Sequence, residues 1–392
     1  MDRRKFLFST GAATAGSLIT NPLIHVIDMR NNKLSEDYPN VEIKKIIRKY
    51  KEDSIPLASV KGTAYECGIQ LGEIWRDIIR TRVVISSKTE KGEPWWAMGN
   101  GIIPKLIDKY APHLREIMKG IQNGAGLKNK PPKIWDWPSG EGNWMFKNEC
   151  SAFAVKPAAT VDGLPLSGQT KDTPEDRVSK YQVLKLEPEG APSFLTLTYP
   201  GELFGHGFAT TGVSLFRNAL YINSGKEGIP FNVWGLISLC SNINIAIDCA
   251  LSYGIKTSGN ALISDGTGRT VSIECTDKGI GVIEHDETIH VHTNHILAPE
   301  LKYIEDQKET KLQGSHLRYE RLKELLEQEL GKISPSRCLQ LLGDHKNYPL
   351  SICRHDYLNS ETTAAVVADP ALGRLYVVRG NPCMNWPVTY SF

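Results

Sequence analysis

The chain has 392 residues, enough for one large hydrophobic core or for two domains of common size. Its hydrophobic content of 41% and charged content of 23% are those of an ordinary globular protein. The 46 basic and 44 acidic residues leave a formal net charge of +2. Because nucleic-acid binding needs a concentrated basic face, this balance argues against a nucleic-acid partner.

The first residues differ in composition from the rest. Arg3 and Arg4 precede a weakly apolar stretch rich in small residues, from Phe6 to Ile19. This order is typical of a secretory signal, and the paired arginines indicate the twin-arginine type. An amphipathic N-terminal segment without a targeting role is the alternative. We therefore expect a signal segment and linker over residues 1–30, and export to the periplasm or cell envelope.

Before residue 150 the pattern is mostly helical. Residues 30–52 are polar and predict a linker with a short helix. A short strand at 56–60 is followed by a helix carrying Tyr65, Gly68, Leu71 and Trp75. A second helix is expected over 103–121 and is ended by Gly124 and Gly126, and an aromatic loop follows at 131–144. No later stretch approaches the roughly 20 apolar residues of a membrane helix, so no stable membrane span is expected.

After residue 150 the pattern changes to strands separated by turns. Helices are expected near 231–253 and 315–330. Strands are expected at 151–155, 181–186, 194–197, 212–216, 261–264, 271–274, 282–284, 363–368 and 374–378. Clustered strands with helices grouped between them predict an α+β fold of layered sheets rather than a doubly wound parallel sheet.

The eight cysteines are scattered and lack the spacing of a zinc ribbon or of a dense disulfide framework. We therefore expect no metal site and no cofactor. Cys150 differs from the others in its position, because it begins the strand-rich part directly after a loop rich in Gly, Asn and Trp. A strand start reached from an exposed loop is a suitable place for a scissile bond.

The segment NECSAFAVKPAATVDGLPLSGQTKD, residues 148–172, resembles the processing site of the acyl-coenzyme A:6-aminopenicillanic acid acyltransferases. These are N-terminal-nucleophile hydrolases (peptidase family C45). Further similar segments follow the family's order at 62–72, 120–127, 291–295, 315–318, 344–345, 351–355 and 380–383. Any one of them could arise by chance, but the ordered series, which spans about residues 55 to 392, is specific.

The resemblance implies a four-layer αββα sandwich and self-cleavage between Glu149 and Cys150. Residues 31–149 would be a mostly helical pro-segment, retained as an α-chain, and residues 150–392 the catalytic β-chain. The freed α-amine of Cys150 has an unperturbed pKa near 8 and its thiol one near 8.5, so one residue supplies both base and nucleophile. The substrate would be a small-molecule amide.

The resemblance also implies roles for four other residues. Asn294 would donate a hydrogen bond to the oxyanion, and Asp172 would orient the α-amine or assist self-cleavage. Ser315 and Arg318 are weaker candidates for substrate binding. From the residues alone, Asp172 could instead shape a turn, Asn294 could cap a backbone bend, and Arg318 could lie on a solvated helix face.

Two departures from the family pattern concern the processing site. Glu149 is bulky and charged where a small residue often precedes the nucleophile, which predicts slow cleavage. Thr170 and Lys171 replace the usual Asn and aromatic residue, which predicts an altered substrate pocket.

The sequence thus predicts a self-processing cysteine amidohydrolase that acts on carbon–nitrogen bonds of N-acyl amines, N-acyl amino acids or short peptides, with possible acyltransferase activity. One alternative is a conventional Cys–His amidase, or a metal amidase built on His292, His295, His345 and His355. Another is a non-catalytic cell-envelope binding protein.

Overall fold

The computed structural model describes residues 54–80, 102–127, 149–222, 228–305 and 310–392. The chain divides into two compact units, Met1–Lys51 and Glu52–Phe392, and the description below concerns the second. The predicted signal segment, the linker and the aromatic loop at 131–144 lie outside the described residues.

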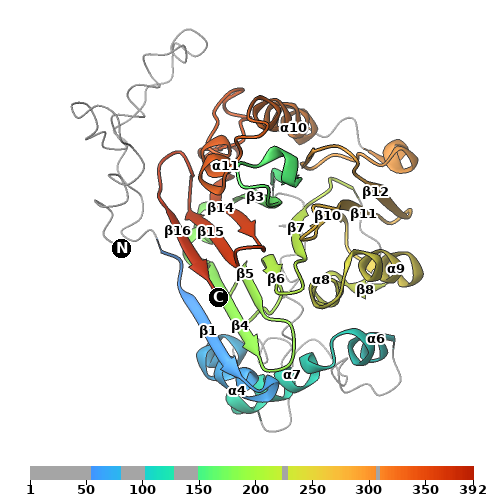
Figure 1. Ribbon diagram of the computed structural model, residues 1–392, viewed down its shortest axis with the longest axis vertical. Coiled ribbons are helices and arrows are strands. Elements are labelled where there is room, and N and C mark those ends of the chain that lie inside the picture. The colour runs from blue at the N-terminus through green and yellow to red at the C-terminus, as the bar shows by residue number, and fades with distance from the viewer. Residues whose placement is uncertain (1–53, 81–101, 128–148, 223–227, 306–309) are drawn as a thin grey trace, which may run out of the picture. The chain divides into compact units, whose positions relative to one another are not determined.

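Two large sheets form the centre of this unit (Figure 1). Neighbouring strands are antiparallel except β1 and β4, which pair in parallel. The eight-stranded sheet runs in the order β1 (Leu57–Gly62), β4 (Gln182–Pro188), β5 (Phe194–Thr198), β6 (His206–Ala209), β7 (Ser214–Asn218), β10 (Gly259–Ser264), β11 (Thr270–Cys275) and β12 (Ile280–Glu284). The six-stranded sheet runs β13 (Ile289–His292), β2 (Ala152–Val155), β3 (Leu166–Thr173), β14 (Glu361–Asp369), β15 (Arg374–Arg379) and β16 (Pro387–Ser391). A small parallel pair joins β8 (Ile229–Pro230) to β9 (Ile255–Lys256).

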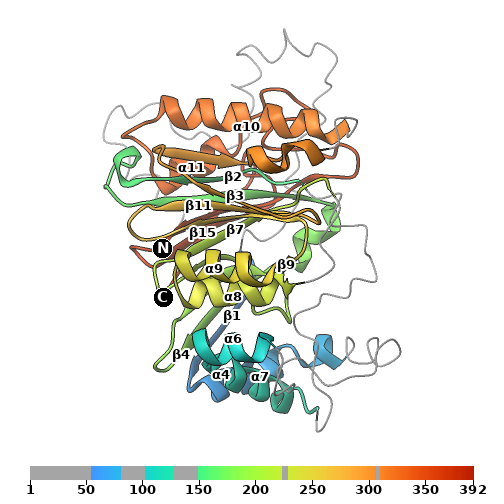
Figure 2. The same cartoon turned by 90° about the vertical axis from the view of Figure 1, so that its right-hand side faces the viewer.

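Helices cover the outer face of each sheet, which gives four layers (Figure 2). On the eight-stranded sheet lie α4 (Ala64–Ile74), α6 (Ile102–Tyr110), α7 (His113–Gly124), α8 (Phe231–Cys240) and α9 (Ile243–Tyr253). On the six-stranded sheet lie α10 (Thr310–Gln328) and α11 (Pro335–Leu341). A separate apolar cluster, which includes Phe216 and Val366, fills the space between the sheets. The predicted αββα sandwich is therefore confirmed.

Within the described ranges, none of the helices combines the length and apolarity that a bilayer crossing needs.

Two of the expected helices are each divided into two. The helix expected over 103–121 breaks at Pro112, which precedes α7 and has no N–H to continue the ladder of α6. The helix expected over 231–253 breaks after Cys240, where the Asn242 side chain accepts a hydrogen bond from Ile245 N at 3.1 Å and starts α9.

The sequence did not predict β3, β6, β8, β9, β13, β16 or α11. The most important omission is β3, whose sequence LSGQTKDT lacks the alternation of a half-buried strand. Seven of its eight residues are nevertheless buried, because β3 lies between β2 and β14 inside the six-stranded sheet. Its polar side chains are part of the site described below.

Helices α4 and α7 pack with their backbones in direct contact. A Cβ atom on Gly120 would lie 2.2 Å from the carbonyl oxygen of Tyr65, and one on Gly68 would lie 2.1 Å from that of Ile117. Gly72 and Gly124 repeat this arrangement one turn further along. Only glycine permits this approach, which joins two helices that precede Cys150.

We expect Gly120→Ala to destabilise the protein by about 1–3 kcal/mol, because the added methyl group must push α7 away from α4. Helix propensity alone predicts the opposite sign, since Ala is favoured over Gly by about 1 kcal/mol inside a helix. Gly266→Ala is the control, because an added Cβ meets nothing within 4 Å there. Urea unfolding measures both variants, and a Gly120→Ala protein as stable as the wild type would contradict the packing.

Candidate active site around Cys150

The peptide bond between Glu149 and Cys150 lies at the entry to β2. Glu149 N–H donates to the Asp172 carbonyl at 3.0 Å, and Asp172 N–H donates to the Glu149 carbonyl at 2.8 Å. These two bonds form an isolated antiparallel bridge three residues before β2 begins, in the same register as the pairing of β2 with β3. The bond is fully buried, since Glu149 is 2% and Cys150 1% exposed.

The backbone of Cys150 is held on both sides. Its N–H donates to Asn294 Oδ1 at 3.1 Å, and its carbonyl accepts from Arg318 Nη1 at 2.9 Å and from Asn218 Nδ2 at 3.3 Å. Asn218 ends β7, Asn294 follows β13 and Arg318 comes from α10. Segments from both sheets and from the outer helix layer therefore fix the geometry of this one residue.

Two buried arginines neutralise the carboxylate of Glu149. Arg318 Nη2 lies 2.9 Å from Glu149 Oε2, and Arg354 forms a second ion pair with the same oxygen. Both arginine side chains are at most 1% exposed. The interpretation of Arg318 as part of a solvated helix face was therefore wrong. The charge of Glu149, the residue before Cys150, is compensated by these two arginines.

Asn294 and Ser315 act as a pair. The Ser315 hydroxyl accepts from Asn294 N–H at 2.7 Å, while Asn294 Nδ2 donates to the Ala219 carbonyl at 2.9 Å. Asn294 Oδ1 also accepts from Arg318 Nη2 at 2.9 Å. Because Oδ1 binds distant residues, the bend-cap interpretation of Asn294 was wrong. Asn294 orients the Cys150 amide, and its role as oxyanion donor stays a prediction.

Asp172 lies within β3 and not in a turn, so the turn interpretation was wrong. Its Oδ1 accepts from the Thr362 hydroxyl at 2.7 Å, and that hydroxyl accepts from Arg354 N–H at 2.9 Å. Its Oδ2 has no hydrogen-bond partner among the described residues. Burial raises the pKa of Asp172 to about 7, although the charges of Arg318 and Arg354 oppose this rise. The carboxyl can therefore take or release a proton near neutral pH.

The Cys150 thiol is protonated at neutral pH, because burial raises its pKa. The charge of Lys171 is the largest influence on this pKa in the other direction. Lys171 Nζ lies 3.2 Å from His206 Nε2. Burial lowers the pKa of His206 well below 6.5, so this ring is neutral. A base must therefore remove the thiol proton before sulfur can attack.

The histidines proposed for the conventional amidases do not form one site. His292 binds the buried Glu274 carboxylate at 2.8 Å, and His295 binds the Ser315 hydroxyl at 2.9 Å. His345 and His355 contact each other instead, at 2.9 Å. Among the described residues, no hydrogen bond joins a histidine ring to the Cys150 sulfur. The geometry thus gives no support to a Cys–His pair at Cys150.

Sequence reasoning assigned no role to Arg354, Thr362 or Asn218, all of which contact the site. Arg354 lies in segment 351–355, which resembles the family, but the resemblance gave no role for the arginine itself. Asn218 and Thr362 lie in strands outside any motif, and only the sheet pairing brings them close to the Glu149–Cys150 bond.

The model of the acyl-coenzyme A:6-aminopenicillanic acid acyl-transferase family matches residues 160–383, more than half of the chain. The chain belongs to this family. The matched region contains Asp172, Asn294, Ser315 and Arg318, while Cys150 lies ten residues before it.

Similar solved structures include a mutant conjugated bile acid hydrolase from Clostridium perfringens, with 12% identity, a TM-score of 0.41, and coverage of 62% of this chain and 97% of that one. A Caenorhabditis elegans orthologue of N-acylethanolamine-hydrolyzing acid amidase has 13% identity and a TM-score of 0.40, covering 57% and 94%. Penicillin V acylase from Agrobacterium tumefaciens has 9% identity and a TM-score of 0.39, covering 59% and 83%. Likeness at this level does not assign a substrate.

The raised pKa of Asp172 predicts a pH-dependent stability. The folded state binds this proton more tightly than the unfolded state, whose Asp pKa is near 3.9. The stabilisation is therefore complete below about pH 4 and lost as pH rises through about 7, by up to about 4 kcal/mol. The free energy of unfolding in urea is measured from pH 4 to 8 for Cys150→Ala and for the double variant Cys150→Ala/Asp172→Asn. The free energy of unfolding of Cys150→Ala should fall relative to that of the double variant as the pH rises. Parallel pH profiles would contradict the assignment.

Proposed function

We propose that the protein is a self-processing cysteine amidohydrolase that acts on linear amide bonds of N-acyl amines, N-acyl amino acids or short peptides. The observation that carries the proposal is the arrangement at the Glu149–Cys150 bond. Its carbonyl oxygen already accepts a hydrogen bond from Asp172 N–H at 2.8 Å, within the range of an oxyanion donor.

In self-cleavage the ionised Asp172 carboxylate takes the Cys150 thiol proton, the sulfur attacks the carbonyl carbon of Glu149, and the Asp172 N–H stabilises the oxygen as its negative charge develops. The carbon–nitrogen bond then breaks, the Cys150 nitrogen takes that proton from Asp172, and Glu149 is left as a thioester on sulfur. Water hydrolyses this thioester, giving a free thiol, a free α-amine and a C-terminal carboxylate on Glu149. The two arginines hold the Glu149 side chain while this occurs.

In catalysis the new α-amine accepts the thiol proton, and the sulfur attacks the carbonyl carbon of a substrate amide. The amine product leaves with that proton, and water releases the acyl group from sulfur. Asn294 Oδ1, which accepts from Cys150 N–H in the uncleaved chain, would orient the α-amine. Its Nδ2 group would turn from Ala219 to the oxyanion. The free Oδ2 of Asp172 would pair with the α-ammonium.

We propose hydrolysis rather than acyl transfer as the main activity. A twin-arginine-type N-terminus would deliver the protein to the periplasm or cell envelope, away from cytoplasmic acyl-coenzyme A. The pro-segment would remain bound as an α-chain, because β1 pairs with β4 over six residues and α4 packs against the same sheet. Cleavage would leave these contacts intact.

The first test is intact mass and N-terminal sequencing of the purified wild type beside Cys150→Ala. We expect the wild type to contain a fragment that begins at Cys150, and Cys150→Ala to remain whole, because the variant lacks the attacking sulfur. The two wild-type fragments should elute together in size-exclusion chromatography. A folded wild type that stays intact would contradict self-processing and favour the binding-protein alternative.

Asn294→Ala in processed enzyme should lower kcat on an N-acyl amine by about 10²–10³, the usual cost of a lost oxyanion donor. Ser315→Ala should lower it less, because among the described residues the Ser315 hydroxyl hydrogen-bonds to Thr293, Asn294 and His295 and not to Cys150. Steady-state kinetics on fragments already shown to begin at Cys150 separates this effect from slow processing. Equal kcat values for Asn294→Ala and the wild type would remove Asn294 from catalysis.

A further inference from the structure

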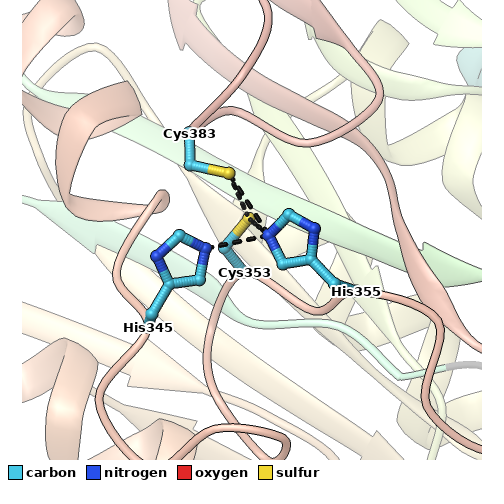
Figure 3. A group of neighbouring side chains, drawn as sticks. All are labelled: His345, Cys353, His355 and Cys383. Carbon is cyan, nitrogen blue, oxygen red and sulfur yellow. Dashed lines mark hydrogen bonds between the residues drawn. The ribbon is translucent and has the colours of Figure 1, made fainter. Parts of the chain in front are cut away.

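A second group of reactive side chains lies apart from Cys150. His345, Cys353 and His355 come from the segment between α11 and β14, and Cys383 follows β15. Their four ligand atoms all lie within 4.8 Å of one another, and Figure 3 shows the side chains converging on one point. Cys353 is buried, and the other three are partly buried.

Four of the six separations between the ligand atoms are close to those of a tetrahedral metal site. Zinc bonds of about 2.3 Å to sulfur and about 2.0–2.1 Å to nitrogen place two sulfurs about 3.8 Å apart, two nitrogens about 3.3 Å apart, and sulfur and nitrogen about 3.6 Å apart. Here the two sulfurs are 3.5 Å apart and the two Nε2 atoms 2.9 Å apart. His355 Nε2 lies 3.7 Å from the Cys353 sulfur and 3.3 Å from the Cys383 sulfur.

A disulfide does not explain the cluster. A sulfur–sulfur bond is about 2.05 Å long, and both cysteines are free thiols 3.5 Å apart. A disulfide would also leave the two histidines without a reason to converge on the same sulfurs. Two thiolates with two neutral imidazoles, in contrast, balance the charge of a divalent ion.

We propose that His345, Cys353, His355 and Cys383 bind one zinc ion. Because protein atoms fill all four positions, the ion is structural and has no open position for water or substrate. This site replaces the expectation of no metal. It does not depend on the proposed amidase activity.

The zinc site holds Arg354 in place. Arg354 lies between two of the ligands, and its side chain pairs with Glu149 at the scissile bond. Asn381 Nδ2 lies 3.7 Å from the Cys353 sulfur and donates to the Arg354 carbonyl, so it supports both the ligand and the arginine. Arg354 N–H also binds Thr362, the partner of Asp172. Loss of zinc should therefore loosen the Glu149 ion pair and slow cleavage.

The test is elemental analysis of the untagged full-length chain, expressed with added zinc and passed over a chelating resin. We expect about one zinc per chain. Cys383→Ala should bind zinc at least roughly tenfold more weakly, since the loss of even a supporting group costs about 10–100-fold in affinity. Cys338→Ala, which removes a buried thiol outside the cluster, should keep its zinc.

Cobalt loading gives a second readout that is independent of activity. The wild type and Cys338→Ala should show the visible absorption of four-coordinate cobalt and a sulfur-to-cobalt charge-transfer band, and Cys353→Ser should lose the band. A reduced, folded wild type that takes up neither metal would overturn the proposal. A Cys353–Cys383 disulfide in protein purified without reductant, found by peptide mapping, would overturn it as well. Both results are obtained on the wild type, so a variant that fails to fold leaves the test intact.

Discussion

The buried guanidinium of Arg318 is the interaction on which the arrangement around Cys150 depends. It contacts the Cys150 carbonyl, the Ser151 hydroxyl, the Glu149 carboxylate and the Asn294 amide oxygen, at 2.9–3.0 Å. A buried charge is costly unless it is paired and hydrogen-bonded, and these four acceptors supply that compensation. The same contacts connect both sides of the Glu149–Cys150 bond to α10. Removing Glu149 would leave Arg318 without the carboxylate it contacts, whereas removing Arg318 would leave Glu149 paired with Arg354 alone.

The polar strand β3 is possible because the layers around it are apolar. Phe153 and Val367 close one face of its sheet together with α10 and α11, and Ala154 and Val366 close the other against the eight-stranded sheet. Water is excluded from between these layers, so the Asp172 carboxyl loses its hydration and its pKa rises to about 7. The hydrophobic core thus sets the proton affinity of a group beside the scissile bond.

The segment before Cys150 is part of the same structure as the segment after it. Strand β1 lies at the edge of the eight-stranded sheet, and the glycine contacts between α4 and α7 add a helical layer beneath it. Arg354, which pairs with Glu149, is flanked in the chain by Cys353 and His355 of the proposed zinc site. The segment before Cys150 is thus fixed by packing, and the Glu149 side chain is held by an arginine that lies next to the proposed metal ligands.

The amino-acid sequence by itself determined the fold class, the family and the position of Cys150, because ordered motifs and strand–turn patterns are local in the chain. It also predicted most strands of the eight-stranded sheet, since their alternation and turns are local too. It did not predict β3, whose polar residues are buried only because neighbouring strands and helices cover them. Nor did it predict the partners of Glu149, or the cluster of His345, Cys353, His355 and Cys383. Those contacts join residues far apart in the sequence, and only tertiary structure brings such charges and ligands within bonding distance.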